Sequence, residues 1–319
     1  PMRLMPSKLI SFLPAKFYYG ATRRWLGWLG ERALQRADYD LVTAWSQSAR
    51  TLFTRAAQRG IPRLLHSGNL HVAGKGSPLL PQRWPAIDGT FMLAEFDLSS
   101  LIMVPSGFCR ESFLLQGVAP DRVVSVERGA DQSRYFPAAE RPPGFRVICC
   151  GQVCERTGVE QLVEAWRRAA LPEAELWFVG AVDHEVAAFV AGVRDPSIHF
   201  CGFQKNPGDF IRQGHVQILL SRNEGLAKTL IEGAACGLAT VATPASGFPI
   251  EEGVTGCFVN RDQPDQVAAV LRRLHAEPAL VARLGRAGRE FAARHFIWER
   301  FHRDFVSVVD GLLAQAPRP

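Results

Sequence analysis

From Phe145 onward, short apolar runs alternate with segments of helical pattern. The runs read RVICCG, ELWFVG, SIHFCGF, VQILLS and LATVAT, and segments such as GVEQLVEAWRRA and AKTLIEGAACG lie between them. Strands that are apolar on both faces and separated by helices are typical of a parallel sheet covered by helices on two sides. The second half of the chain is therefore predicted to be a doubly wound α/β domain.

The first half repeats this alternation less regularly. The predicted strands are DLVTAW, PRLLH, LIMVPS and RVVSVE, the predicted helices are SARTLFTRAAQRG and GFCRESFLLQG, and a Gly/Pro-rich stretch from Gly68 to Gly89 predicts one long loop. Between the halves lies FPAAERPPGF, whose prolines and glycine deny both helix and ladder pairing. We predict a second α/β unit joined to the first by this linker.

The last helical pattern runs from Trp298 to Leu313 and carries an apolar stripe that needs a surface to dock on. The predicted domains are therefore 1–140, 141–296 and a C-terminal helix over 297–319. Ligands of parallel sheets bind outside the carboxyl ends of the strands, so two such domains facing one another would create a cleft.

Composition and charge limit the class of protein to which the chain can belong. A chain of 319 residues suits two domains, and 47% hydrophobic with 21% charged residues is typical of a globular protein. No apolar stretch is long enough to predict a transmembrane helix. The net charge of +6 would attract phosphates or an anionic lipid surface and does not imply nucleic acid. Seven cysteines, several in predicted strands, favour a reducing cytoplasm over a disulfide scaffold or a zinc site.

The segment SRNEGLAKTLIEGAACGLATVATPASG, residues 221–247, carries the main candidate site. It follows a predicted buried strand, turns at Glu224-Gly225, and continues as a helix from about Ala227 to Cys236. A helix N-terminus offers unpaired backbone N–H groups and the positive end of the helix dipole, which suits a diphosphate. The candidate contacts at this N-terminus are Gly225, Leu226, Ala227, Lys228 and Thr229.

Glu224 and Glu232 lie on either side of this helix start, roughly 10 Å apart along the axis. That separation is comparable with the reach from a sugar ring, past a diphosphate, to a ribose. Glu232 would accept the ribose hydroxyls and Glu224 would meet the sugar. The alternative is that Glu224 is a turn residue and Glu232 a solvated helix position.

This segment resembles family 4 of the retaining glycosyltransferases. In that family a serine is followed by Glu-Gly, and a second glutamate comes eight positions after the first. A helix of small residues that ends in Gly completes the motif. Residues 104–137, the turn GFPIEEGVTGCFV and the last helix resemble further parts of the family. The resemblance implies a GT-B fold, in which two doubly wound Rossmann-like domains face one another and a C-terminal helix crosses back to the first. It implies transfer of a hexosyl unit, with retention of configuration, from a nucleotide sugar to a glycan, lipid-linked or small-molecule acceptor.

The resemblance also implies further site residues. Gly202 and Phe203 would meet the nucleobase, with Phe203 as a core residue the alternative. Gly151 would lie in the donor site. The family's diphosphate clamp of Arg and Lys is replaced here by Gln152 and Thr157, so Arg156 or Lys228 would supply the missing charge unless both are solvated cations. The predicted catalytic residues are Glu224 and His71. The alternative is that His71 is a loop or core residue, while His66 and Lys75 match the family's cleft residues less well.

No obligatory metal or other cofactor is expected beside the nucleotide sugar. A second reading is a catalytically weak GT-B partner or regulatory subunit that binds nucleotide without turnover; a third is a sugar-nucleotide epimerase. The family's first strand and Gly-rich loop have no match, so we expect the start of the acceptor domain to be missing. The segment SKLISFLPAKFYYGATRRWLGWLGERALQR mixes aromatic and basic residues, which predicts peripheral contact with the inner face of the cytoplasmic membrane. A core helix is the alternative.

Overall fold

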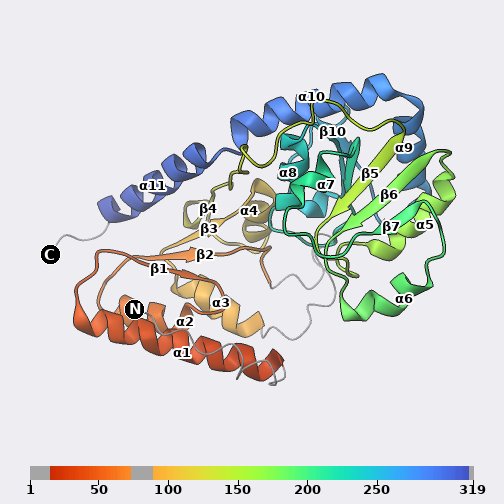
Figure 1. Ribbon diagram of the computed structural model, residues 1–319. Helices are drawn as coiled ribbons and strands as arrows, with labels where there is room; N and C mark the ends of the chain where they lie inside the picture. Colours follow the sequence, from red (N-terminus) through yellow and green to blue (C-terminus); the bar gives the residue numbers. More distant parts are fainter. Residues whose placement is uncertain (1–14, 73–88, 316–319) are drawn as a thin grey trace. The chain divides into compact units, whose positions relative to one another are not determined.

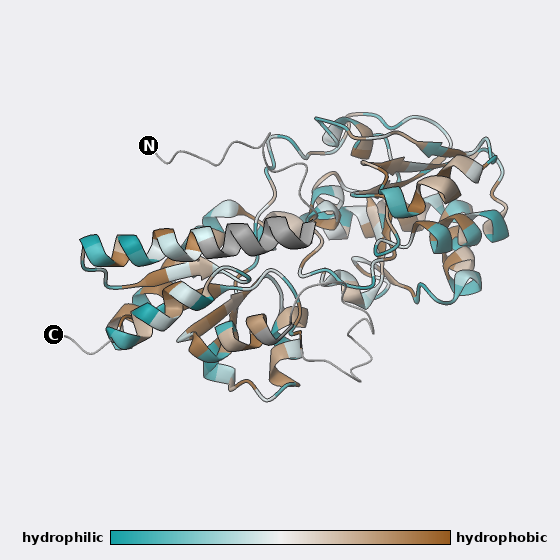
Figure 2. Cartoon of the chain, turned by 90° about the horizontal axis from the view of Figure 1, so that it is seen from below, coloured by the Kyte–Doolittle hydropathy of each residue, from teal (hydrophilic) through white to brown (hydrophobic). Residues whose placement is uncertain are grey.

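The computed structural model describes residues 15–72 and 89–315, which form two compact units (Figure 1). Within those residues, the first unit takes 15–72, 89–104, 112–124 and 306–315, and the second takes 105–111 and 125–305. Each unit contains a sheet flanked by helices, and Figure 2 shows the strands of both largely in the brown of apolar residues. The predicted α/β class is confirmed.

The first unit contains a four-stranded sheet in the order β1-β2-β3-β4, with β2 parallel to both β1 and β3. Its elements are α1 (Ala15–Arg36), β1 (Val42–Trp45), α2 (Arg50–Gln58), β2 (Arg63–His66), α3 (Gly89–Leu98), β3 (Leu101–Val104), η2 (Pro120–Arg122) and β4 (Val123–Ser125), with α4 (Gly107–Leu114) shared between the units. Among the described helices, none is long and apolar enough to cross a membrane.

A buried carboxylate fixes the start of α2. Ala49 precedes this helix and has no side chain with which to cap it. Glu95 of α3 is fully buried and accepts hydrogen bonds from the backbone N–H groups of Ala49 at 2.7 Å and Gln47 at 2.6 Å. A carboxylate at this position satisfies orphan donors and complements the helix dipole. Sequence reasoning missed α3 because its residues, GTFMLAEFDL, are apolar without a one-sided helical stripe.

The second unit contains a six-stranded sheet in the order β10-β9-β8-β5-β6-β7, and every neighbouring pair is parallel. Its strands are β5 (Phe145–Cys150), β6 (Ala174–Val179), β7 (Ile198–Phe200), β8 (Val216–Leu219), β9 (Ala239–Ala242) and β10 (Gly256–Phe258). Its helices are α5 (Val159–Ala169), η3 (His184–Val186), α6 (Ala187–Gly192), α7 (Gly208–Ile211), α8 (Lys228–Ala235), η4 (Pro244–Ser246), α9 (Pro264–Ala276) and α10 (Pro278–His295), and α11 (Trp298–Gln315) follows.

The strand order places a topological switch point between β5 and β8. The chain runs from β5 outward to β6 and β7, and then returns to the other side of β5 with β8. All four residues of β8 and of β9 are buried, which is why both are mostly apolar, with Gln217 and Thr240 as the buried polar exceptions. In open parallel sheets the ligand crevice lies at the carboxyl ends of the two strands at such a point. The loops after β5 and β8 are therefore where a ligand site is expected.

Candidate functional site

The loop after β8 ends at the start of α8. Ala227 is the residue before the helix, and its side chain accepts no capping hydrogen bond. Two hydrogen bonds to the segment after β9 fix the main chain of this loop. Glu224 N–H donates to the carbonyl of Ala245 at 2.8 Å, and Ala227 N–H donates to that of Ser246 at 2.9 Å. The N-terminus of α8 is thus held in place while its first N–H groups lack a side-chain cap.

Gly247 allows this loop to pass close to its neighbour. Its φ is +67°, and a Cβ atom at this position would lie 2.4 Å from the carbonyl oxygen of Gly225. That carbonyl also accepts a hydrogen bond of 2.6 Å from the Ser106 hydroxyl. Any larger residue at position 247 would displace the Glu224-Gly225 turn, because it would need both a strained φ and the space that the carbonyl fills.

Glu224 lies at the switch point, where its carboxylate contacts residues from both loops. It forms an ion pair with Arg156 of the loop after β5, and it accepts a hydrogen bond of 3.1 Å from the Ser221 hydroxyl. Its side chain is 24% exposed and that of Arg156 is 43% exposed, so both remain accessible to a ligand. Arg156 also donates to the carbonyl oxygen of Asn223 at 3.3 Å.

Glu232 is buried inside α8, with only 4% of its side chain exposed. The alternative that it is a solvated helix position is wrong. Its carboxylate lies 3.0 Å from the Lys228 Nζ one turn earlier and is close enough to Tyr135 to influence the pKa of that side chain. Burial, with the Glu232 charge second, raises the pKa of Tyr135, and burial together with Glu232 raises the pKa of the Cys150 thiol to about 12. Tyr135 therefore stays neutral beside Glu232. Sequence reasoning missed Tyr135, although it lies in the quoted segment 104–137.

Gln152 and Thr157 make contacts within the protein. The Gln152 amide donates to the Asp183 carboxylate at 2.7 Å. Thr157 is buried, and its hydroxyl lies 2.9 Å from the carbonyl oxygen of Gln152 and 3.0 Å from that of Cys154. By contrast, Arg156 and Lys228 each lie against one of the two glutamates. Both side chains are also open to solvent, with 43% of Arg156 and 62% of Lys228 exposed.

Gly202 and Phe203 follow β7, which lies two strands from β5 in the sheet. Gly202 has a φ of +66°, and nothing lies within 4 Å of the Cβ that another residue would place there. The Phe203 side chain is 78% exposed. The alternative that Phe203 is a core residue is therefore wrong. An exposed ring and an open glycine leave room for a planar ligand beside this loop.

The predicted catalytic histidine lies in the first unit. His71 is 5% exposed and packs between Phe96 at 5.0 Å and Phe113 at 4.9 Å between ring centroids. Burial lowers its pKa to about 4, with Asp97 opposing the shift, so the imidazole is neutral at pH 7. His66 lies on β2, where its Nε2 is 2.6 Å from the Thr43 hydroxyl. Lys75 lies outside the described residues. These contacts favour the structural reading of His71.

Carboxylates do not gather into a metal centre in the part of the chain that the structure describes, where no three His, Cys, Asp or Glu side chains form a candidate site. The sequence contains one Asp-x-Asp, Asp38-Tyr39-Asp40, just before β1. Asp38 forms an ion pair of 2.6 Å with Arg59 in the first unit.

The fold and part of the sequence match known proteins. Residues 144–277 match the family described as glycosyl transferases group 1. The domain formed by residues 144–277 belongs to the group 1 glycosyl transferases. The solved structure of HepE from Anabaena in complex with UDP superposes on the chain with a TM-score of 0.76 at 15% identity, over 90% of this chain and 82% of HepE. The GT-B class predicted from the sequence is confirmed.

Two curated relatives have sequence similarity to part of the chain. D-inositol 3-phosphate glycosyltransferase of Streptomyces bingchenggensis is 33% identical over 99 residues, which are 30% of this chain and 22% of that protein. A lipopolysaccharide core biosynthesis glycosyltransferase of Rhizobium meliloti is 28% identical over 203 residues, which are 61% of this chain and 55% of that protein. The chain thus spans about half, or less, of the length of these relatives.

The burial of His71 predicts a pH dependence of stability. Because the unfolded chain takes up a proton near pH 6.5 and the folded protein only near pH 4, the free energy of unfolding falls as the pH is lowered between these values. His71→Phe should flatten the profile by about 3 kcal/mol, since each pKa unit corresponds to roughly 1.4 kcal/mol. Urea unfolding of both proteins from pH 7 to pH 4 measures this; parallel profiles would contradict the burial of a neutral imidazole.

Proposed function

We propose that the chain transfers a hexosyl unit from a nucleotide sugar to a glycan, lipid-linked or small-molecule acceptor, with retention of configuration. The observation that carries the proposal is the pair of glutamates on either side of the uncapped N-terminus of α8, at the switch point of a group 1 glycosyl transferase domain. HepE, which has a similar fold, was solved with UDP, and this supports a nucleotide-linked donor. The Rhizobium relative supports a role in the synthesis of cell-envelope polysaccharide.

The chemistry of the site follows from its charges. The N–H groups and dipole of α8 would bind the diphosphate, and the buried Glu232 would accept the ribose hydroxyls. Glu224, in the loop before the helix, would contact the sugar. Negative charge develops on the diphosphate as the glycosidic bond breaks, so fixed dipoles and cations around it stabilise the transition state. We propose that the reaction needs no obligatory metal and that the partners do not include nucleic acid.

The second candidate function is a catalytically weak GT-B partner that binds nucleotide without turnover. It is favoured by the side chains of Gln152 and Thr157, which are occupied by contacts within the protein rather than free to bind a diphosphate. Donor hydrolysis or transfer by the purified protein separates the two functions. Nucleotide binding without any turnover would support the second.

We propose a cytoplasmic location and peripheral contact with the membrane through α1. Trp28 and Leu26 are 48% and 39% exposed, and Arg32 lies over the Trp28 ring at 4.7 Å. Phe12 and the side chains of Phe17, Tyr18 and Tyr19 lie outside the described residues.

Exposed aromatic and basic side chains on one helix predict binding to anionic vesicles at low salt, because rings enter the headgroup region and cations attract the lipids. Trp28→Ser should weaken co-sedimentation, whereas Trp298→Ser, at a tryptophan 39% exposed on α11, should not. A wild type that stays in the supernatant at low salt would exclude this contact.

Arg156 or Lys228 should serve as the diphosphate clamp, because each lies against a glutamate of the site and can turn to a phosphate. Removing the cation that makes the contact should weaken nucleotide binding by about 1.5 to 3 kcal/mol, the range for a charge-assisted hydrogen bond. Calorimetric titration of Arg156→Ala and Lys228→Ala measures this, with Arg168→Ala, an exposed arginine paired with Glu164, as the control. Unchanged affinity in both variants would exclude the clamp.

The two glutamates should respond differently to substitution, because their partners matter at different stages. Glu232→Ala should chiefly raise the donor KM, since the ribose is held equally in ground and transition states. Glu224→Gln should lower kcat by about 100-fold or more with less effect on donor affinity. Glu164→Ala removes a comparable helix ion pair and is the control. Equal and small effects at both positions, in a folded and active protein, would show that this pair is not the donor site.

A further inference from the structure

A buried arginine lies beneath the loop after β5. Arg261 follows β10, and its side chain is 4% exposed. A guanidinium removed from water in this way is costly unless hydrogen bonds and opposite charges replace the water. Its contacts therefore show what it does.

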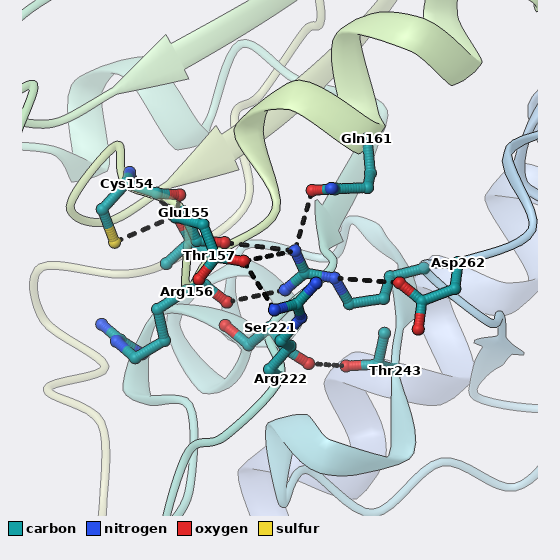
Figure 3. Close-up of polar contacts among 10 residues, drawn as sticks. Cys154, Glu155, Arg156, Thr157, Gln161, Ser221, Arg222, Thr243 and Asp262 are labelled. Carbon is teal, nitrogen blue, oxygen red and sulfur yellow. Dashed lines mark hydrogen bonds and ion pairs between the residues drawn. The ribbon is translucent and has the colours of Figure 1, made fainter. Parts of the chain in front are cut away.

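The Arg261 guanidinium donates mainly to the main chain of two successive loop residues. One terminal nitrogen donates to the carbonyl of Arg156 at 3.1 Å, and the other donates to the carbonyl of Glu155 at 3.2 Å and to the Gln161 side chain at 2.8 Å. The carboxylates of Glu155 and Asp262 lie 3.5 Å and 3.8 Å away. Figure 3 labels Glu155, Arg156 and Gln161, whose contacts with this guanidinium are drawn as dashed lines.

The same two residues are also held by the loop after β8. The Arg156 carbonyl also accepts the backbone N–H of Arg222 at 3.0 Å, and the Glu155 carboxylate lies 2.8 Å from the Arg222 guanidinium. A carbonyl has two lone pairs, so both donors can be satisfied at once. The backbone of residues 155 and 156 is thus fixed between two loops.

This fixation determines where the Arg156 side chain lies. From the fixed backbone, its guanidinium reaches the Glu224 carboxylate and the Asn223 carbonyl. Displacing a loop by about 1 Å is enough to disrupt a positioned catalytic group. A planar guanidinium can bridge two carbonyls and a side-chain amide, which the single ammonium of a lysine cannot do with the same geometry.

We propose that Arg261 is a positioning residue: it holds the main chain of Glu155 and Arg156 so that the Arg156 side chain lies at Glu224, where it meets the donor diphosphate. The inference rests on the proposed function, because the diphosphate is the ligand that Arg156 would bind.

Amide hydrogen exchange tests the structural half without any ligand. Arg261→Met should speed exchange at the N–H groups of Gly158 and Arg222, since their acceptors are the carbonyls of Glu155 and Arg156. Arg272→Met is the matched control, because Arg272 also donates to a main-chain carbonyl, that of Arg168 at 3.0 Å, on an exposed helix face. Two results would overturn the inference: faster exchange throughout the second unit, or unchanged exchange at Gly158 and Arg222. If Arg261→Met does not fold, the same measurement is made on Arg261→Lys.

A double-mutant cycle with UDP as the probe tests the functional half. Arg261→Met and Arg156→Ala should each weaken UDP binding by about 10-fold, the lower end for a lost charge-assisted contact. The double variant should bind no more weakly than Arg156→Ala alone, because Arg261 acts only through Arg156. If Arg261 acts independently of Arg156, the double variant should lose affinity by the product of the two single losses, and that result would overturn the inference. If the wild type binds none of UDP, GDP, ADP and TDP, the proposed function fails, whereas multiplied losses in a binding protein refute only the role of Arg261.

Discussion

The parallel pairing of β5 with β8 is the constraint on which the candidate site depends. Val147 pairs with Val216 and Ile148 with Gln217, although 69 residues separate each pair along the chain. This pairing brings the loop of Arg156 beside the loop of Glu224. Gln217 strengthens the arrangement from inside the sheet, since its buried amide donates to the carbonyl of Thr229 in the first turn of α8 at 2.7 Å. The start of α8 is therefore tied to the strand beneath it.

The two glutamates have different environments because they lie at different distances from the helix start. Glu224 is partly exposed in a loop and pairs with a cation from another strand, whereas Glu232 is enclosed in the helix, pairs with Lys228 and lies near Tyr135. A buried carboxylate must be hydrogen-bonded or paired, and the ion pair with Lys228 meets that requirement. Glu232 is thus a fixed acceptor, while Glu224 retains room to exchange partners.

The sequence predicted much of this arrangement because the relevant signals are local. Buried parallel strands read as apolar runs, and a helix after Glu224-Gly225 followed from the small residues up to Gly237. Contacts between distant segments could not be read in the same way. Nothing in the residues around Arg261 indicates that it lies beneath Arg156, 105 positions earlier. The apolar helix α3 and the position of Tyr135 near Glu232 were missed for similar reasons, since their meaning depends on tertiary neighbours.

Gln152 and Thr157 stand where the family has an Arg and a Lys, so the positive charge at the switch point comes from other residues. Under the proposed function, a diphosphate would meet Arg156 and Lys228, each already beside a carboxylate. The side chains of Arg156 and Glu224 are both accessible, and such an ion pair contributes about 1 kcal/mol or less, so its rearrangement toward a doubly charged ligand costs little. The glutamates keep these cations near the site while it is empty. Releasing Glu224 from Arg156 would also free its carboxylate for the sugar, so binding of the diphosphate and readiness of Glu224 would be coupled through one guanidinium.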